Sequence, residues 1–245
     1  MRLCPPANGL ASSPFAKVCN LVNARGEVLA LQTTAVPLGP LSWQVPTLPP
    51  VSTHAAVKIE AKHGLLRLGT AVFNWQGSQL WAAKPAWQQL KGRTFQSPSL
   101  TFPPLLQTRW QQYLAALAVQ NEAEMMKTAV ALAGMGTGLT PSGDDLLVGS
   151  FYALWAGDVS PNLLARLGMA AAEKTSTLSA SFLRAAAAGE AVAPWHALVA
   201  GLPNAVDQIT AVGHHSGRES WFSFCETHTV LAKMSWSNSN IRGQP

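Results

Sequence analysis

One stretch of the chain combines glycines, hydroxyl side chains and carboxylates in a way that suits the binding of a small anion. Residues 134–145 read Gly-Met-Gly-Thr-Gly-Leu-Thr-Pro-Ser-Gly-Asp-Asp. Glycines at this density let the backbone adopt positive φ and approach a ligand closely. The second half of the stretch predicts a helix start, whose free N–H groups and partial positive charge favour an anion. We expect the oxygens of a phosphate or carboxylate to be bound by Gly136, Gly138, Thr140, Ser142 and Gly143.

Two adjacent carboxylates, Asp144 and Asp145, close this glycine loop, although Asp and Glu number only 12 in the 245 residues. They could orient a substrate amino group, exchange a proton or hold Mg²⁺. Because a bare carboxylate repels phosphate, any role beside a phosphate needs a cation, a donor or a proton between the carboxylate and the phosphate. The alternative is a glycine-terminated helix followed by a turn and a capped helix without a ligand. No Gly-Lys-Ser/Thr follows, and a helix precedes the loop, which excludes the common nucleotide-binding motifs.

A second motif, Gly-His-His-Ser-Gly-Arg-Glu, occupies residues 213–219. His214 could move a proton near neutral pH, and Arg218 could hold a carboxylate or phosphate with two hydrogen bonds. Ser216 and Gly217 repeat the Ser-Gly of the glycine loop, each with an acid three residues after the serine, and both serines therefore predict capping boxes. The alternative is a capped helix with surface histidines. Adjacent histidines without a third ligand do not indicate zinc, so we expect no metal here.

A third motif is the hydroxyl-rich run Lys-Thr-Ser-Thr-Leu-Ser at residues 174–179. Thr177 and Ser179 could contribute further oxygen ligands for the same anion. The alternative is that Ser179 is only the N-cap of the following helix. Without a Gly-x-Ser-x-Gly sequence, the chain gives little support to a serine-hydrolase triad.

The elements that would position these motifs divide the chain into two halves. Short alternating segments with glycine turns predict strands up to about residue 100, with a hairpin around Asn23-Ala24-Arg25-Gly26. We expect strands over 17–22, 27–32, 56–60, 65–68, 71–75 and 79–83, with a proline-rich loop over 37–50. Ala/Leu-rich helical spacing follows, and we expect helices around 110–132, over 142–155, from Ser160-Pro161, over 178–188 and over 195–212.

These segments predict an α+β fold. A β-rich, barrel-like domain would span residues 1–102, an all-α domain carrying the glycine loop would span 103–234, and a flexible tail would span 235–245.

Composition narrows the functional classes. The chain is 48% hydrophobic and only 12% charged, with a net charge of +5. Its basic residues form no cluster of the kind that binds nucleic acid. No apolar run is long enough for a membrane span, and no signal peptide is expected at the N-terminus. The three cysteines have no metal-binding spacing, which favours reduced thiols and a cytoplasmic location.

Together, Gly136–Asp145, Thr175–Ser179 and Gly213–Gly217 resemble the AllH-like family, whose named member is a subunit of oxamate carbamoyltransferase. Thr137 stands where that family usually has proline, and Glu219 where it often has aspartate. The resemblance implies a cytoplasmic enzyme subunit that works with two other subunits in allantoin and purine breakdown. The implied reaction is phosphorolysis of oxalurate by phosphate, which gives carbamoyl phosphate and oxamate.

On this basis we expect Asp144, Asp145 and His214 to be catalytic, with either Asp144 or His214 moving the proton of the carbamoyl nitrogen. Ser216, Gly217 and Arg218 join the expected binding residues. We expect no obligatory cofactor, although Mg²⁺ stays an option at the aspartates. The rival hypothesis is a non-catalytic anion-binding or assembly subunit whose partner performs the chemistry.

Overall fold

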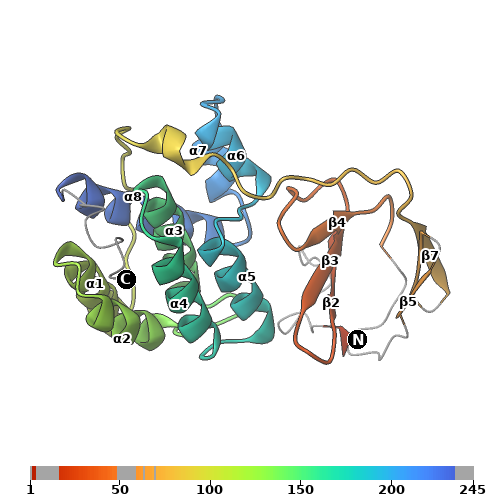
Figure 1. Ribbon diagram of the computed structural model, residues 1–245, viewed down its shortest axis with the longest axis horizontal. Coiled ribbons are helices and arrows are strands. Elements are labelled where there is room, and N and C mark those ends of the chain that lie inside the picture. The colour runs from red at the N-terminus through yellow and green to blue at the C-terminus, as the bar shows by residue number, and fades with distance from the viewer. Residues whose placement is uncertain (1, 4–16, 49–58, 63, 69, 235–245) are drawn as a thin grey trace, which may run out of the picture.

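The computed structural model describes residues 2–3, 17–48, 59–62, 64–68 and 70–234, and places small sheets before a helical half (Figure 1). The expected tail at 235–245 and the first residues of the strand expected at 56–60 lie outside the described residues. The mixed character predicted from the sequence is confirmed, since strands come first in the chain and helices follow.

The first sheet has the order β1-β2-β3-β4. Its strands are β1 (Arg2–Leu3), β2 (Val18–Val22), β3 (Val28–Gln32) and β4 (Ser42–Gln44). The predicted hairpin is confirmed: β2 and β3 are antiparallel, and the Asn23 side chain accepts hydrogen bonds from the backbone N–H groups of Arg25 and Glu27, at 2.9 Å each. The loop expected at 37–50 is wrong at residues 42–44, where β4 pairs in parallel with β3.

The second sheet is an antiparallel meander of β5 (Ile59–Lys62), β6 (Leu65–Leu68) and β7 (Ala71–Asn74). The strand expected at 79–83 is absent from the described chain, because this segment leaves the sheet and meets the helical half. There the backbone N–H of Ala191 donates to the carbonyl of Ala83 at 2.8 Å. The described residues therefore form two open sheets, and a barrel-like closure is not confirmed.

The helical half begins after the 3₁₀ turn η2 (Trp87–Leu90). The single helix expected over 195–212 is wrong, because positive φ at Gly201 and the following Pro203 break it into two. None of the described helices is long and apolar enough to cross a membrane. The helices are α1 (Pro104–Ala118), α2 (Glu122–Leu132), α3 (Ser142–Ala156), α4 (Pro161–Ala172), α5 (Thr177–Ala187), α6 (Ala193–Val199), α7 (Ala205–Thr210) and α8 (Ser216–Ala232).

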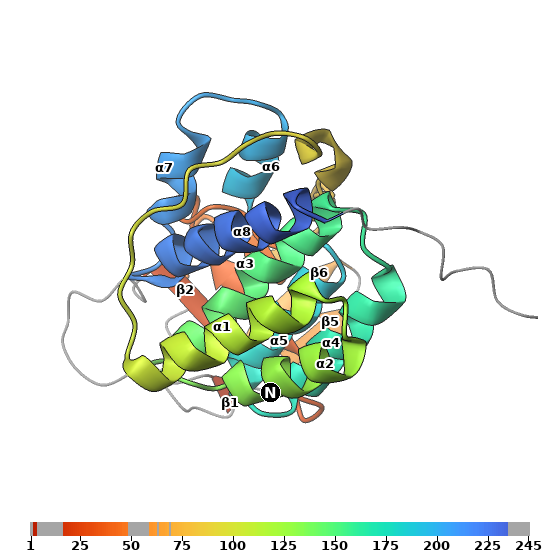
Figure 2. The same cartoon turned by 90° about the vertical axis from the view of Figure 1, so that its left-hand side faces the viewer.

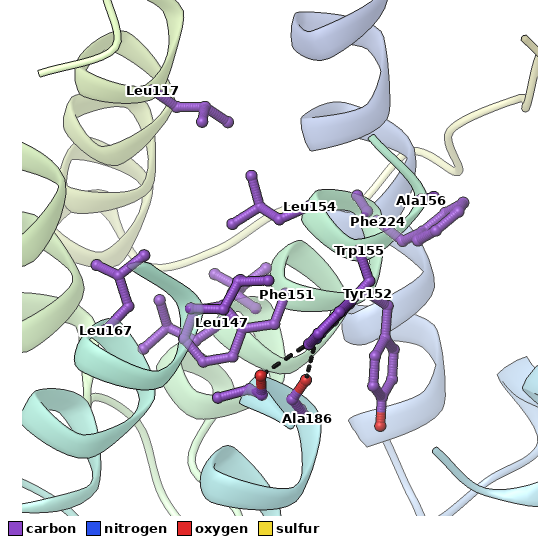
Figure 3. Close-up of a cluster of buried hydrophobic side chains, with 14 of the residues drawn as sticks. Leu117, Leu147, Phe151, Tyr152, Leu154, Trp155, Ala156, Leu167, Ala186 and Phe224 are labelled. Atoms are coloured by element: carbon purple, nitrogen blue, oxygen red, sulfur yellow. Dashed lines mark hydrogen bonds between the residues drawn. The ribbon is translucent and has the colours of Figure 1, made fainter. Parts of the chain in front are cut away.

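Helix α3 is the centre of this half. All of its residues except Ser142 and Val148 are buried, and α8 and α5 pack along it (Figures 1 and 2). Its apolar side chains share one core with neighbouring helices, and Figure 3 shows Phe151 and Leu154 among these side chains. Trp87 and Leu90 belong to the same core, although they precede the domain boundary predicted at residue 102. That boundary stays a prediction.

The close approach of α3 and α8 depends on Gly149. A methyl group at this position would overlap the Ser220 carbonyl oxygen and crowd the Ser223 hydroxyl of α8. Glycine normally weakens a helix interior by about 1 kcal/mol relative to alanine, so its use here indicates a steric requirement.

We predict that Gly149→Ala lowers the free energy of unfolding by about 1–3 kcal/mol or more, because backbone atoms of α8 must move. Gly157→Ala is the matched control. Its added methyl would chiefly meet the flexible end of Leu231, at 2.8 Å, and we expect a change below about 1 kcal/mol. Urea denaturation followed by circular dichroism measures both. Equal stabilities for the two variants would contradict the steric role of Gly149.

Candidate functional site

The glycine loop lies where α3, α5 and α8 all begin. Ser142 at the start of α3 donates to the Glu219 carboxylate of α8 at 2.9 Å. Ser176, the N-cap of α5, donates to the Leu139 carbonyl of the loop at 3.0 Å. Near the other end of α3, Trp155 donates to two carbonyls near the end of α5 (Figure 3). The helices thus run in the same direction, and three positive helix ends meet at one loop.

Asp144 joins the glycine loop to the hydroxyl-rich motif. Its side chain is 1% exposed. Its Oδ1 accepts from the Gly134 backbone N–H at 2.8 Å, and its Oδ2 accepts from the hydroxyls of Ser179 at 2.6 Å and Thr175. A buried carboxylate is tolerated when donors of this kind replace water. Both Asp144 oxygens are therefore occupied by groups that fix the loop against α5.

Asp145 occupies a different environment beside α8. Burial raises the pKa of this carboxyl well above its usual value, and the neighbouring charges of Glu219 and Asp144 raise it further. Hydrogen bonds with the side chains of Ser216 and Thr140 act in the opposite direction. Because burial is the largest influence, Asp145 keeps its proton at higher pH than an ordinary aspartate.

The two Ser-Gly motifs pair with each other across the helix starts. The hydroxyls of Thr140 and Ser216 lie 2.9 Å apart, and Ser142 bonds Glu219 as described above. The predicted capping boxes are wrong, since the N-cap residues are Pro141 and His215 and neither helix has a side-chain cap. The N-cap suggested at Ser179 is also wrong, because Ser176 takes that place. The hydroxyls instead hold one helix start against another.

The backbone of the glycine loop lies at the surface. Gly136 and Gly138 have φ of +118° and +94°, and residues 136–138 are exposed. A side chain at Gly136 would lie 2.7 Å from the Ser142 nitrogen, so glycine leaves that N–H uncovered. Within the described part of the chain, the backbone N–H groups of 136–140 meet no acceptor. By contrast, the N–H groups of Gly143 and Gly217 donate to the carbonyls of Met135 and Val212.

The remaining predicted site residues lie at the surface. Thr177 is exposed and faces the turn at Gly26, away from Asp144. His214, His215 and Arg218 are exposed, and the two histidine rings contact each other with centroids 4.1 Å apart. The structure thus joins the buried members of the three motifs directly and leaves these side chains around the rim.

Sequence reasoning missed three contributors to this network, namely Thr175, Ser176 and Glu219. Each lies inside a motif that was recognised, and each forms a hydrogen bond to another motif. The sequence did show a run of three hydroxyl residues at 175–177 and an acid three residues after Ser216. Neither pattern indicates which residue of another motif the side chain would bond.

For Mg²⁺ the arrangement around Asp144 is unsuitable. Its oxygens face N–H and O–H donors, whereas a cation requires free oxygen ligands. Among the residues that the structure describes, no three His, Cys, Asp or Glu side chains gather in a metal-binding arrangement.

The site is therefore a glycine loop held at converging helix starts in the helical half of the chain. Residues 132–226, from the end of α2 into α8, match the family model described as oxamate carbamoyltransferase subunit AllH. The match includes all three motifs and confirms the resemblance that they indicate. No curated protein and no solved structure matches the chain significantly.

We predict that Asp144→Ala lowers the free energy of unfolding by about 2–4 kcal/mol, because one backbone N–H and two hydroxyls lose their buried acceptor. Asp144→Asn should cost less, since its amide oxygen can still accept from Gly134. Asp207→Ala, at an exposed position of α7, is the control and should change stability by less than about 0.5 kcal/mol. Thermal and urea denaturation measure the series. A loss for Asp144→Ala no larger than the control's would contradict the role assigned to this carboxylate.

The raised pKa of Asp145 determines in which direction its contribution to the free energy of unfolding changes with pH. Between the ordinary aspartate pKa of about 3.9 and the higher folded value, the native state holds more protons than the unfolded state. The contribution of Asp145 to stability is therefore full below the ordinary pKa and is lost as pH rises through the folded pKa.

Asp145→Asn removes this titration and keeps the shape of the side chain. We predict that the variant gains stability relative to the wild type as pH rises from 4 to 8, by at most about 1.4 kcal/mol per pH unit. Urea denaturation at each pH measures the difference, with Asp207→Asn as control. A difference that stays constant across this range would rule out a raised pKa at Asp145.

Proposed function

We propose that the chain is a subunit of an oxamate carbamoyltransferase-like enzyme, which acts in the cytoplasm on allantoin-derived oxalurate. The observation that carries this proposal is the row of backbone N–H groups at 136–140, which have no acceptor among the described residues. They lie beside three helix starts and inside the region that matches the family. Phosphate, oxalurate and carbamoyl phosphate are all anions of a size that a short loop can hold.

In this proposal the loop amides and the Ser142 N–H bind phosphate or carboxylate oxygens and stabilise the charge that develops on them. Arg218 has no ion-pair partner among the described residues, and its exposed guanidinium can reach an anion at the rim. The buried acids beneath the loop do not oppose this binding strongly. Asp144 is surrounded by donors, and the raised pKa of Asp145 favours its neutral form.

The acids and the histidine then take different roles. Asp144 is a positioning residue, because its two oxygens are already bonded to Gly134, Thr175 and Ser179. His214 is the better proton carrier, since its ring is exposed and lies two residues before Ser216. The protonation state of Asp145 decides whether a second negative charge lies beneath the glycine loop.

The proposed reaction exchanges one bond for another at the carbamoyl carbon. A phosphate oxygen attacks this carbon and forms the C–O bond of carbamoyl phosphate. The C–N bond to the oxamate portion breaks, and the leaving nitrogen takes up the proton that hydrogen phosphate loses, which His214 can relay. No oxidant, reductant or covalent enzyme intermediate is needed.

A rival function is favoured by the openness of the site. Residues 136–138, His214 and His215 are exposed, and two hollows of the described structure, of about 550 and 320 Å³, are lined by none of the predicted site residues. In this second proposal the same loop recognises an anion or a partner subunit, and the partner carries the catalytic groups.

Gly136→Ala tests the anion site, because its methyl group would cover the Ser142 N–H. Gly92→Ala is the matched control: its φ is also positive, at +78°, and no other group lies within 4 Å of the added methyl. We expect the chain, purified with its partner subunits, to form carbamoyl phosphate from oxalurate and phosphate. Gly136→Ala should lower this rate at least tenfold and Gly92→Ala less than twofold.

His214→Ala in the same complex separates the two functions. A loss of kcat with assembly intact supports the catalytic proposal, whereas full activity in both His214→Ala and Gly136→Ala complexes assigns the chemistry to the partner. Size-exclusion chromatography of each complex shows whether assembly is retained. If no complex forms carbamoyl phosphate from oxalurate, the proposed reaction is wrong.

A further inference from the structure

A hollow of about 550 Å³ lies between α4 and α5, away from the glycine loop. It falls within the range of about 300–1,000 Å³ typical of small-molecule sites. None of its lining residues is among the site residues that the three motifs predict. Those that matter here are Lys84, Trp155, Asn162, Ala165, Met169 and Arg184.

Two positive side chains, Lys84 and Arg184, line this hollow, and its lining contains no acidic residue. The Lys84 ammonium lies 3.3 Å from the centroid of the Trp155 ring. Burial lowers the pKa of Lys84, and the charge of Glu190 opposes that effect only in part. Neither Lys84 nor Arg184 forms an ion pair within the described residues. The lining of this hollow holds no acid to balance the two cations, so an anion bound between them would reduce their mutual repulsion.

The rest of the lining includes both apolar and polar residues. Trp155, Ala165 and Met169 offer apolar surface, and Met169 is 64% exposed. Asn162 stands in the first turn of α4, where the N-cap Ser160 makes no side-chain hydrogen bond. An apolar wall with a few polar groups is the usual composition of a small-molecule site.

Gly189 leaves space for the contact between Lys84 and Trp155. Its φ is +85°, and a side chain there would lie 2.9 Å from both Lys84 Cε and Trp155 Cε2. The Gly189 carbonyl accepts from the Trp87 indole at 2.7 Å, which fixes the segment in place. The backbone thus leaves room for the lysine to cover the indole.

A smaller hollow of about 320 Å³ lies on the other side of Arg184 and provides a contrast. It is lined by Glu27 and Glu190 as well as Arg25 and Arg184, so on this side Arg184 has acids near it, whereas the lining of the larger hollow has none. Only the larger hollow combines cations with no acidic lining residue.

We propose that the hollow between α4 and α5 is a second binding site, for a small organic anion in which a phosphate or carboxylate group is joined to an apolar body. Lys84 and Arg184 hold the anionic group, Asn162 donates to it, and the apolar body lies against Met169 and Ala165. The site is independent of the glycine loop and of the reaction proposed there.

Phenyl phosphate is a suitable probe, and phenol is its neutral counterpart. The full chain should bind phenyl phosphate with a Kd of about 1 mM or lower by isothermal titration calorimetry, and phenol at least tenfold more weakly. The double variant Lys84→Gln/Arg184→Gln should weaken phenyl phosphate binding at least tenfold. A control double variant on α1 and α2, Arg109→Gln/Lys127→Gln, removes the same charge away from the hollow and should leave binding within twofold.

Two further variants locate the binding. Ala165→Trp should block the hollow with no change of charge, whereas Gly136→Ala should leave phenyl phosphate binding intact, because it alters only the glycine loop. Equal binding of phenol and phenyl phosphate, or wild-type affinity in Lys84→Gln/Arg184→Gln, would overturn the proposal. So would loss of binding only in Gly136→Ala, which would assign the probe to the loop instead. Circular dichroism confirms that each variant is folded.

Discussion

The arrangement of the site depends on one buried charge, the carboxylate of Asp144. A charge with 1% exposure is tolerated only where donors replace its lost water, and Gly134, Thr175 and Ser179 supply them. The donors come from two segments, the glycine loop and the start of α5. Displacing the glycine loop or the start of α5 would leave part of this charge unsatisfied. The carboxylate therefore makes the loop and two helix starts a single unit.

The same constraint explains how three parallel helices can begin side by side. Their positive ends repel one another, and negative side chains at those ends reduce the repulsion. The acids that can supply this charge are Asp144 in the first turn of α3 and Glu219 in the first turn of α8. The close packing behind them needs Gly149, because a larger residue would meet the backbone of α8. Electrostatics at the helix starts and steric fit along the helices thus support the same geometry.

Much of the local structure could be predicted from the sequence, because it depends on neighbouring residues. The hairpin at Asn23-Ala24-Arg25-Gly26, the start of α3 at Ser142 and the start of α4 at Ser160-Pro161 follow from turn and helix preferences. Errors arose where distant contacts decide the outcome. Strand β4 exists because β3 offers it a partner, and the segment 79–83 meets the helical half instead of a sheet.

By itself the sequence determined which side chains are available: a glycine-rich loop, scarce adjacent aspartates and two further motifs that resemble the AllH-like family. Only the tertiary structure decided what each polar group does. Ser142 and Ser216, which look alike in sequence, bond across to α8 and to the loop instead of capping their own helices. The adjacent aspartates point to different partners, one to α5 and the other to α8. Successive residues on a helix face different neighbours, and the hydrogen bonds of a buried group depend on those neighbours.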